Sequence, residues 1–447
     1  MADEVPSLKR SSARSVQTSR PDGAHAPSRG RIVPFAASAT GIALLVFVYL
    51  VVTWRSFAGV TNAIPPFTEL FSDFIDYYFP MGEAIFRTGL PVEGFLYSPF
   101  IAILLAVFPP LGLSASLVIW GILQVFFVIL YLLLFRWLVP AGLQIQLLFV
   151  TLTLSSFPLL LNQLGGQVSV FMTVAILGLL VLNERGHRTA CAGLFAFAVS
   201  FKFYPILFLA PFAARRDVRF LLFAAAACGA ILVVVPGVLL GFGDLLRFYR
   251  ALLDSFHVSG WVTTNPHSQY FPHLALRLTD TMGYDAHTYL PFLYFITYGV
   301  AAANMGLIFL VQRARLRCAD LWSFQLVFLS IPFVLKTSWP HDFVFLSFTQ
   351  AFMVWRLLEG EKVAPGFDTA GKRSHTSTCV RTCAAVTFFL LLPSIVFSNI
   401  VFFNLFGDFI RYGFYGFLFW ANLLLLLAMY VQLLPSVLRR ILKPPAA

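Results

Sequence analysis

The chain has few charged residues and few positions at which metals or disulfides could form. Only 11% of its 447 residues are Asp, Glu, Lys or Arg, whereas 59% are hydrophobic. A soluble globular domain carries about 25% charged residues, so this composition excludes that class. The five cysteines are scattered, and the pair Cys379 and Cys383 has no second pair with which to complete a zinc site. We therefore expect no metal, no disulfide framework and no cofactor.

The sequence also lacks a signal peptide and the usual nucleotide-binding motifs. The first thirty residues are rich in Ser, Arg, Ala and Pro, which is typical of a disordered tail. The apolar stretch that follows begins too late and runs too long for a signal peptide. There is no Gly-rich phosphate loop of the P-loop kind. There is also no DxD cluster of the sort found in nucleotide-sugar enzymes, because Asp73 and Asp76 are separated by one residue too many.

What the chain does contain is a series of apolar runs near the length of a membrane-spanning helix, beginning with 33–53. Helices are expected because lipid-exposed backbone must satisfy its own hydrogen bonds. We predict an all-α transmembrane bundle with about twelve crossings. The runs 96–111 and 190–213 are interrupted, the first by prolines and the second at Lys202. Such breaks are tolerated around a polar cavity, so we expect a short dip and a broken helix there.

The distribution of charge predicts the topology. The net charge of +11 comes from arginines and lysines in short loops and tails, which is the positive-inside pattern and does not indicate nucleic-acid binding. Both termini are then cytosolic in a multi-pass plasma (inner) membrane protein, and the polar stretches 54–95 and 241–290 are extracytoplasmic. The predicted parts are a disordered cytosolic tail (1–31), a transmembrane core (32–358), a cytosolic linker (359–383) and a C-terminal transmembrane pair with a cytosolic tail (384–447).

The first extracytoplasmic stretch carries a row of charged residues at helical spacing. The row is Glu69, Asp73, Asp76, Pro80, Glu83 and Arg87, and the opposite face is Leu70, Phe74, Tyr77, Met81 and Ile85. This pattern predicts an amphipathic helix at the membrane surface, with amphipathic helices in the extracytoplasmic loops generally. Asp73 is a candidate general base or an anchor for a polar acceptor, and the alternative is that the whole row simply faces water.

Four further groups are candidates for binding a substrate. Gln167 follows a Gly-Gly turn whose amides could bind sugar hydroxyls or merely close a hairpin. Lys202 lies in an apolar segment, where an ammonium needs a partner or water unless it snorkels to the interface. The second outer loop offers Asn265, Ser268 and Arg277, and the cap between two later spans offers Lys336, Trp339 and His341. Their cations could neutralise a phosphate, and both loops could instead be ordinary solvated turns.

Several short motifs resemble glycosyltransferase family 87, over about residues 70 to 345. They are Asp73-Phe-Ile-Asp-Tyr77-Tyr, Gly89-Leu-Pro, Tyr97-Ser-Pro99, Gly166-Gln167, Lys202-Phe-Tyr-Pro205, Asn265 to Ser268 with Arg277, and Ser338-Trp339-Pro-His341. The resemblance implies a GT-C fold. It also implies an enzyme that, like α-1,2-mannosyltransferases, transfers a sugar (most often mannose) from a polyprenyl-phosphate carrier to a hydroxyl of a glycolipid or glycan acceptor on the extracytoplasmic face.

The resemblance also implies roles for individual residues. Asp73 falls on the family's catalytic aspartate, while Trp339 and His341 fall on its late motif. The residues expected to bind substrate are Asp76, Tyr77, Tyr97, Gln167, Lys202, Asn265, Ser268, Arg277, Lys336, Trp339 and His341. We expect one inverting, metal-independent displacement in which cations stabilise the leaving phosphate. The main alternative is a lipid or sugar transporter or flippase, although no internal repeat of the kind transporters contain is visible.

Overall fold

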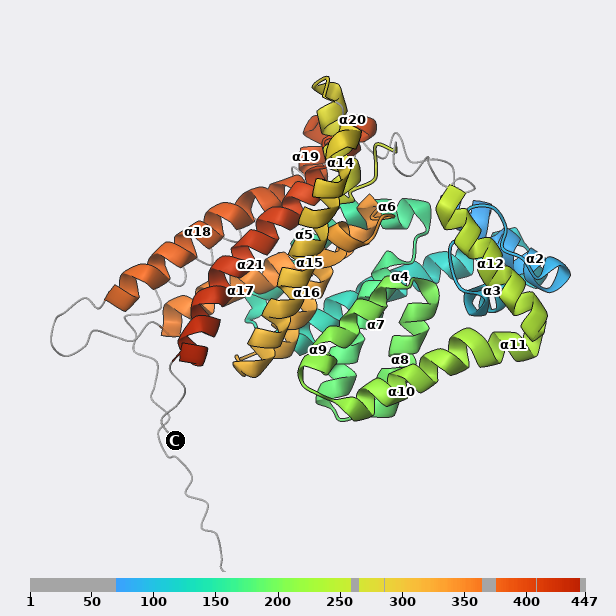
Figure 1. The fold of residues 1–447 in the computed structure, drawn as a ribbon, viewed down its shortest axis with the longest axis horizontal. Helices are drawn as coiled ribbons and strands as arrows, with labels where there is room; N and C mark the ends of the chain where they lie inside the picture. The colour runs from blue at the N-terminus through green and yellow to red at the C-terminus, as the bar shows by residue number, and fades with distance from the viewer. Residues whose placement is uncertain (1–69, 259–264, 285, 364–374, 407, 443–447) are drawn as a thin grey trace, which may run out of the picture. The chain divides into compact units, whose positions relative to one another are not determined.

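The computed structural model describes residues 70–258, 265–284, 286–363, 375–406 and 408–442 (Figure 1). These residues form helices joined by short turns, with one isolated bridge between Ser156 and Asn399 and no strand among them. The predicted all-α fold is therefore confirmed. The first predicted span, 33–53, and the predicted tail, 1–31, lie outside the described residues.

The helices follow one another with few long connections; η marks a 3-10 or π segment. In chain order they are η2 (Phe74–Tyr78), α2 (Phe79–Thr88), α3 (Pro99–Leu105), η3 (Pro109–Leu111), α4 (Leu113–Leu138), α5 (Leu143–Leu154), α6 (Phe157–Gly165), α7 (Ser169–Glu184), α8 (Arg188–Phe201), η4 (Tyr204–Phe208), α9 (Leu209–Ala214), α10 (Val218–Gly229), η5 (Ala230–Val234), α11 (Val235–Leu240), α12 (Phe242–Val258), α14 (Phe271–Thr281), η6 (Ala286–Tyr289), α15 (Leu290–Arg313), α16 (Ala319–Val334), η7 (Pro340–Val344), α17 (Phe345–Val363), α18 (His375–Phe397), α19 (Ile400–Phe406), α20 (Phe409–Phe414) and α21 (Phe417–Leu442).

Four described helical segments are long and apolar enough to cross a membrane: Leu113–Leu138, Val218–Leu240, Leu290–Arg313 and Phe409–Leu442. A fifth is possible if α6 and α7, which are bent by 116° at their junction, form one broken span. The described residues thus contain fewer helices of spanning length than the about twelve crossings predicted. The difference arises because several apolar runs, α3, α5, α8 and α16 among them, are shorter helices.

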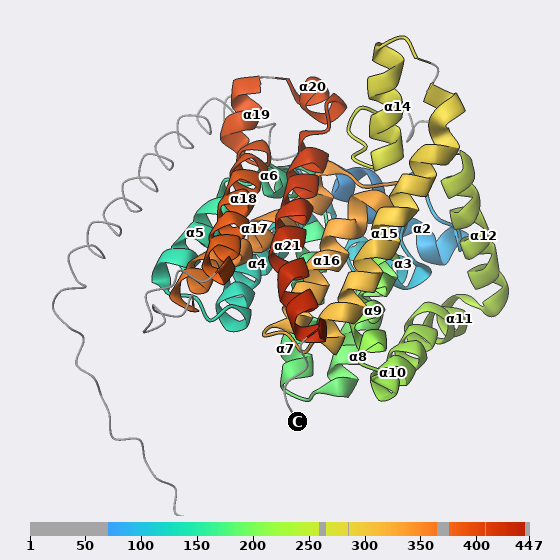
Figure 2. The same ribbon diagram turned by 60° about the vertical axis from the view of Figure 1, so that its left-hand side comes forward.

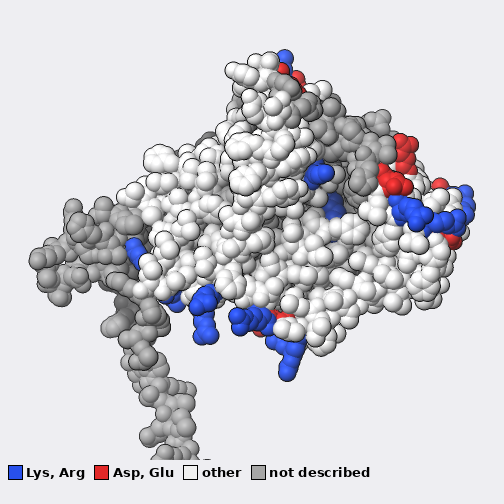
Figure 3. Space-filling model, viewed as in Figure 1, with Lys and Arg blue, Asp and Glu red and all other residues white. Residues whose placement is uncertain are grey.

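The helices pack into one bundle in which α16 is the most enclosed. Every residue of α16 from Leu321 to Phe333 is buried, beside α15 and α21 (Figures 1 and 2). The C-terminal pair α18 and α21 packs together and against α17, and the backbone on either side of Ser156 hydrogen-bonds to the turn at Asn399. By contrast, α10 buries only Phe220 and Ala224. Figure 3 shows the result, a broad uncharged surface with lysines and arginines along its lower edge.

Three interruptions of helices come together inside this bundle. α6 ends at Gly165 and α7 starts at Ser169, α8 ends at Phe201 before the extended Lys202, and α16 ends at Val334 before η7. The break at Lys202 is the one that the sequence predicts. Freed backbone groups at such breaks need polar neighbours, so this region is where polar side chains are concentrated.

The amphipathic helix predicted around Asp73 is present as η2 and α2, with its register shifted. Phe74, Tyr78, Met81 and Ile85 are buried, and Asp76 is exposed. Tyr77, predicted on the buried face, is only half-buried, and Tyr78 takes its place. The cause is the π segment over Phe74–Tyr78, whose wider turn inserts one extra residue into the repeat.

Candidate active site

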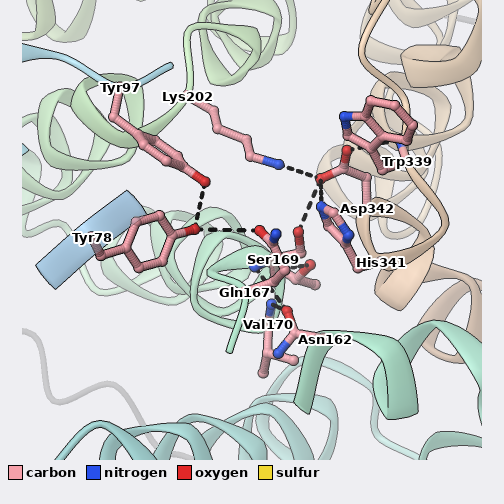
Figure 4. A network of polar contacts seen from close by, with 11 residues as sticks. Tyr78, Tyr97, Asn162, Gln167, Ser169, Val170, Lys202, Trp339, His341 and Asp342 are labelled. Atoms are coloured by element: carbon pink, nitrogen blue, oxygen red, sulfur yellow. Dashed lines mark hydrogen bonds and ion pairs between the residues drawn. The ribbon is translucent and has the colours of Figure 1, made fainter. Parts of the chain in front are cut away.

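The most enclosed ion pair of the described residues joins two of these breaks. Lys202 Nζ donates a hydrogen bond of 2.6 Å to Asp342 Oδ1, and the two side chains are 16% and 0% exposed. Ser169 Oγ donates to the same oxygen at 2.9 Å, and the Trp339 backbone N–H donates to Oδ2 at 3.1 Å (Figure 4). Burial alone would raise the pKa of Asp342, but the Lys202 ammonium and the hydrogen bonds from Lys202 and the Trp339 N–H hold it below its usual value. Asp342 is therefore a fully paired carboxylate.

A pair of buried amides holds the bend between α6 and α7 in place. Asn162 Oδ1 accepts from the backbone N–H groups of Ser169 and Val170, at 3.0 and 3.2 Å. Asn162 Nδ2 donates at 3.0 Å to Gln124 Oε1, and Gln124 Nε2 donates at 2.8 Å to the Gln167 carbonyl. Two of the free N–H groups in the first turn of α7 are thus satisfied by this side chain. This capping fixes Ser169 where it reaches Asp342.

The segment that leads into η2, together with Trp120 of α4, packs directly onto the same bend. The Phe71 N–H donates to the Leu164 carbonyl at 2.7 Å, and Trp120 Nε1 donates to the Gly166 carbonyl at 2.9 Å. Gly166 has φ +65, and a Cβ there would lie 2.7 Å from the Phe71 Cβ. Only glycine allows this approach. The Gly-Gly turn recognised in the sequence therefore positions the start of the helix that carries Asp73.

Two phenols connect the first loop to Gln167. Tyr78 and Tyr97 share a hydrogen bond of 2.6 Å between their hydroxyls, and the Tyr78 hydroxyl also donates to Gln167 Oε1 at 3.3 Å (Figure 4). Burial raises the pKa of both phenols, so they are neutral donors and acceptors. The side chain of Gln167 is thus already engaged in the protein, as is that of Tyr97.

Asp73 is more accessible than Asp342. It is half-buried at the start of η2. Burial raises the pKa of Asp73 to about 6, opposed by the positive charge of Lys202 and assisted by the negative charge of Asp76. The Lys202 ammonium lowers the pKa of Asp73, so the two groups interact electrostatically. A carboxylate that titrates near neutral pH suits proton transfer.

His341 and Trp339 lie beside Asp342 at the start of η7. His341 Nε2 is 3.9 Å from Asp342 Oδ1, and its side chain is 15% exposed. Burial lowers the pKa of His341 to about 4, although Asp342 acts in the opposite direction. His341 is therefore neutral at neutral pH, which removes it from the cations expected to face a phosphate. It retains a hydrogen-bonding ring beside the pair. We call Lys202, Asp342, Ser169 and His341, with Asp73, the inner cluster.

A second group, the loop cluster, comprises Asn265, Ser268, His273, Arg277 and Lys336. Arg277 is 7% exposed and donates to the carbonyls of Asn265 at 3.0 Å and Ser268 at 2.7 Å. Burial lowers the pKa of Arg277 to about 10, so it is still charged at neutral pH. The guanidinium expected to bind phosphate thus holds a loop of its own chain.

The other members of the loop cluster are divided between internal contacts and solvent. Ser268 Oγ lies 2.9 Å from His273 Nδ1, and Asn265 Oδ1 accepts from the His267 N–H at 2.8 Å. Burial, with the charges of Arg277 and Lys336, lowers the pKa of His273 to about 4. Lys336 itself is exposed. The two clusters are linked where the Gln269 N–H donates to the Ser338 carbonyl at 2.8 Å.

The predicted site residues therefore fall into three groups. The inner cluster and its neighbours bring together Asp73, Tyr97, Gln167, Lys202, Trp339 and His341. Asn265, Ser268, Arg277 and Lys336 belong to the loop cluster. Asp76 is exposed beside Asp73, and Tyr77 packs on the backbone of Gly94, where a Cβ would lie 2.3 Å from its ring.

Sequence analysis missed Asp342 as a site residue, although a signal for it was present. A lysine within an apolar segment requires a buried partner, and Asp342 is the sole acidic residue between Asp320 and Glu359 in the sequence. The capping amides Asn162 and Gln124 gave a weaker signal, as polar residues within or at the end of apolar runs. Among the residues that the structure describes, no group of three His, Cys, Asp or Glu side chains could hold a metal ion.

The comparison with known families adds a match that spans this region. The sequence model of glycosyltransferase family 87 matches residues 95–338, a little more than half of the chain. No curated protein and no solved structure matches the chain. The matched range contains Gln167, Lys202 and the whole loop cluster, while Asp73 precedes it and Asp342 follows it. The chain, with its apolar helices and its inner cluster of buried charges, belongs to glycosyltransferase family 87 and is a membrane glycosyltransferase.

Proposed function

We propose that the protein transfers a sugar, mannose in the first instance, from a polyprenyl-phosphate carrier to a hydroxyl of a glycolipid or glycan acceptor. The observation that carries this proposal is Asp73, a half-buried carboxylate with a pKa near 6, coupled to the Lys202 ammonium. A base and a cation at one site fit a reaction in which an acceptor loses a proton and a phosphate gains charge.

The reaction is a single displacement. The acceptor oxygen attacks the anomeric carbon while Asp73 takes the hydroxyl proton. The bond from that carbon to the carrier oxygen breaks, and its electron pair leaves with the polyprenyl phosphate. Attack opposite to the leaving group inverts the anomeric centre. Asp342 is a poor candidate for the base because its side chain is 0% exposed and already accepts three hydrogen bonds.

Two of the predicted cations are candidates to stabilise the negative charge of the leaving phosphate. Lys202 is paired with Asp342, yet 16% of its side chain is exposed, so it can share its ammonium with a phosphate oxygen. Lys336 is exposed near the loop cluster and is the second candidate. Arg277 and the neutral His341 act instead through position, the first by holding the 265–268 loop and the second as a hydrogen-bonding ring.

The charge distribution supports an active site on the extracytoplasmic side of the membrane. The inner cluster lies at the start of α7 and the end of α8, while Arg185 and Arg188 lie at the opposite ends of these helices. Arginine-rich loops favour the cytosolic side. The inner cluster would then face the extracytoplasmic side of the plasma membrane, where a lipid-linked sugar donor is used.

The test compares Asp73→Asn with Asp76→Asn in purified full-length protein, supplied with polyprenyl-phosphate mannose and a glycolipid acceptor. Asp73→Asn is expected to lower the transfer rate about 10²- to 10⁴-fold, the contribution of a general base. Donor binding should persist. Asp76→Asn removes an exposed carboxylate three residues away and should retain most activity. Normal turnover by Asp73→Asn would remove Asp73 from the mechanism, and absence of transfer by the unmodified protein from any polyprenyl-phosphate sugar would reject the donor class.

A further inference from the structure

A cavity of about 680 Å³ lies at the other end of the helices that form the inner cluster. It is lined by the ends of α7, α9, α15 and α16, with Glu184, Arg215, Gln312, Arg313, Arg315 and Asp320 among the lining residues. α7 connects the two places, since Ser169 contacts Asp342 and Glu184 lines the cavity. At a rise of about 1.5 Å per residue, α7 separates them by about 22 Å. The cavity is therefore distinct from the proposed active site.

One ion pair in the wall of the cavity leaves a cationic donor unused. Arg215 Nη1 donates to Asp320 Oδ2 at 2.5 Å, and Gln312 Nε2 donates to Asp320 Oδ1 at 2.9 Å. Asp320 is thereby neutralised. Arg215 Nη2, however, is buried and has no hydrogen-bond partner among the described residues. A buried donor without an acceptor is costly, so this nitrogen is suited to an acceptor that enters the cavity.

Two further arginines and one carboxylate at the cavity are also without partners. Arg313 and Arg315 are exposed, and their side chains make no ion pair or hydrogen bond with the residues that the structure describes. Arg315 has φ +47, a conformation that L-residues seldom adopt. Glu184 is exposed and likewise lacks an ion-pair partner in the described part of the chain. The cavity thus offers cationic donors on one side and a single free carboxylate.

The position of the cavity restricts what can occupy it. It lies at the ends of several helices and is lined by three arginines. Figure 3 shows Lys and Arg side chains along the lower edge of the uncharged surface. Basic pockets between the ends of membrane helices on the cytoplasmic side are suited to lipid headgroups. The N-terminal stretch 9–31 is itself basic, so charge repulsion disfavours it as the occupant.

We propose that this cavity binds a phospholipid headgroup, with the phosphate against Arg215, Arg313 and Arg315 and a hydrogen-bond donor of the headgroup against Glu184. A phosphate diester supplies the acceptor oxygens that guanidinium groups recognise. A primary ammonium or a hydroxyl beyond the phosphate matches the carboxylate, whereas a trimethylammonium has no N–H to donate. The site is independent of sugar transfer, and its occupant is a structural lipid rather than a substrate.

The experiment measures lipid retention by delipidated full-length protein, using native mass spectrometry. The probes are dioleoylphosphatidylethanolamine and dioleoylphosphatidylcholine, which have the same net charge and differ in their N–H groups. Unmodified protein should bind one molecule of the ethanolamine lipid about threefold more tightly than the choline lipid, the effect of one partly exposed ion pair. Arg313→Gln/Arg315→Gln should weaken binding of both lipids about tenfold, because two charge-assisted hydrogen-bond donors are lost.

Two matched variants complete the design. Arg219→Gln/Arg439→Gln removes the same charge from exposed positions that do not line the cavity, and should keep lipid affinity within about twofold of the unmodified protein. Glu184→Gln should keep the affinity for the choline lipid and abolish the preference for the ethanolamine lipid. Equal losses in the two double-arginine variants would overturn the proposal. So would saturable binding of inorganic phosphate without retention of either lipid, which would assign the cavity to a small anion.

Discussion

The inner cluster and the loop cluster contain similar residues that are used in opposite ways. In the inner cluster, Lys202 is compensated by a carboxylate, Asp342, at 2.6 Å. In the loop cluster, Arg277 is buried without a carboxylate and is compensated by two backbone carbonyls. The first arrangement keeps a positive and a negative charge next to each other inside the bundle. The second uses a cation to fix the shape of a loop.

The difference indicates which charges are available to a substrate. The two carbonyls leave more of the positive charge of Arg277 uncompensated than a carboxylate would. The Arg277 side chain is only 7% exposed, however, so it cannot easily turn to a new partner. Lys202 is more exposed and has a flexible side chain. A negatively charged substrate group is therefore more easily bound by Lys202 and Lys336, which lie at helix breaks, than by Arg277, which lies within α14.

Removing the carboxylate of the inner pair should have the largest effect. Asp342→Asn would leave Lys202 with an uncompensated charge in a mostly buried position, which is expected to lower the free energy of unfolding by about 3 kcal/mol. The measurement is thermal or denaturant-induced unfolding of the purified protein in detergent. The double variant Lys202→Gln/Asp342→Asn should be less destabilised than Asp342→Asn alone, because it contains no unpaired buried charge.

The matched control for this pair is Arg188→Gln. It breaks the Arg188–Asp217 ion pair, 3.4 Å long and 44% exposed on the arginine side, without touching the hydrogen bond from the Phe220 N–H to Asp217. Exposed pairs contribute about 0.2–1 kcal/mol, so the loss should be small. If Asp342→Asn and Arg188→Gln cost the same, the distinction between the buried pair and an ordinary surface pair is wrong.

The loop cluster should respond less strongly. Arg277→Gln removes two charge-assisted hydrogen bonds to the carbonyls of Asn265 and Ser268, and is expected to cost about 2 kcal/mol. Lys336→Gln removes an exposed cation from the same cluster and should change stability by less than about 0.5 kcal/mol. Thermal unfolding and initial transfer rates of the two variants separate the roles. Lys336→Gln should lose transfer without losing stability, and the reverse ranking in stability would contradict the assignment of Arg277 to loop structure.

The sequence could predict the class of fold and the break at Lys202, because each depends on local composition. Apolar runs predict helices in lipid, and a lysine followed closely by a proline interrupts a helix. The register of the Asp73 helix could not be predicted, since a π segment leaves no clear pattern in the residues around Tyr77 and Tyr78. The described residues contain fewer helices of spanning length than about twelve, because several apolar runs form short helices and the predicted span 33–53 lies outside the described residues.

The sequence predicts which positions belong to the candidate site, but it does not predict which of these side chains contact one another. Lys202 is predicted because an ammonium in an apolar segment needs a partner or water. Asp73 and His341 are predicted from the charged row, the polar cap and the resemblance to the family. The sequence could not assign Asp342 to Lys202, which lies 140 positions away, nor Arg277 to two carbonyls of its own loop. Such pairings depend on how the helix breaks meet, and that is decided by packing across the bundle.

The last prediction concerns Asp73, whose ionised form the fold disfavours. Its pKa rises from 3.8 to about 6, mainly through burial, so ionisation costs the folded state more than the unfolded chain. This free-energy cost of ionising Asp73 is absent below about pH 4. It increases between about pH 4 and pH 6 and stays constant at higher pH. Asp73→Asn should therefore unfold at a higher temperature than the unmodified protein at pH 7.5 and not at pH 4. Since one pKa unit corresponds to about 1.36 kcal/mol and solvent screens a half-buried carboxylate, the gain should be about 1–2 kcal/mol.

The exposed Asp76→Asn change should give no such gain. A catalytic carboxylate that is kept at a cost in stability is expected to behave in this way, whereas an Asp73 that merely faces water would show the same stability in both variants at every pH.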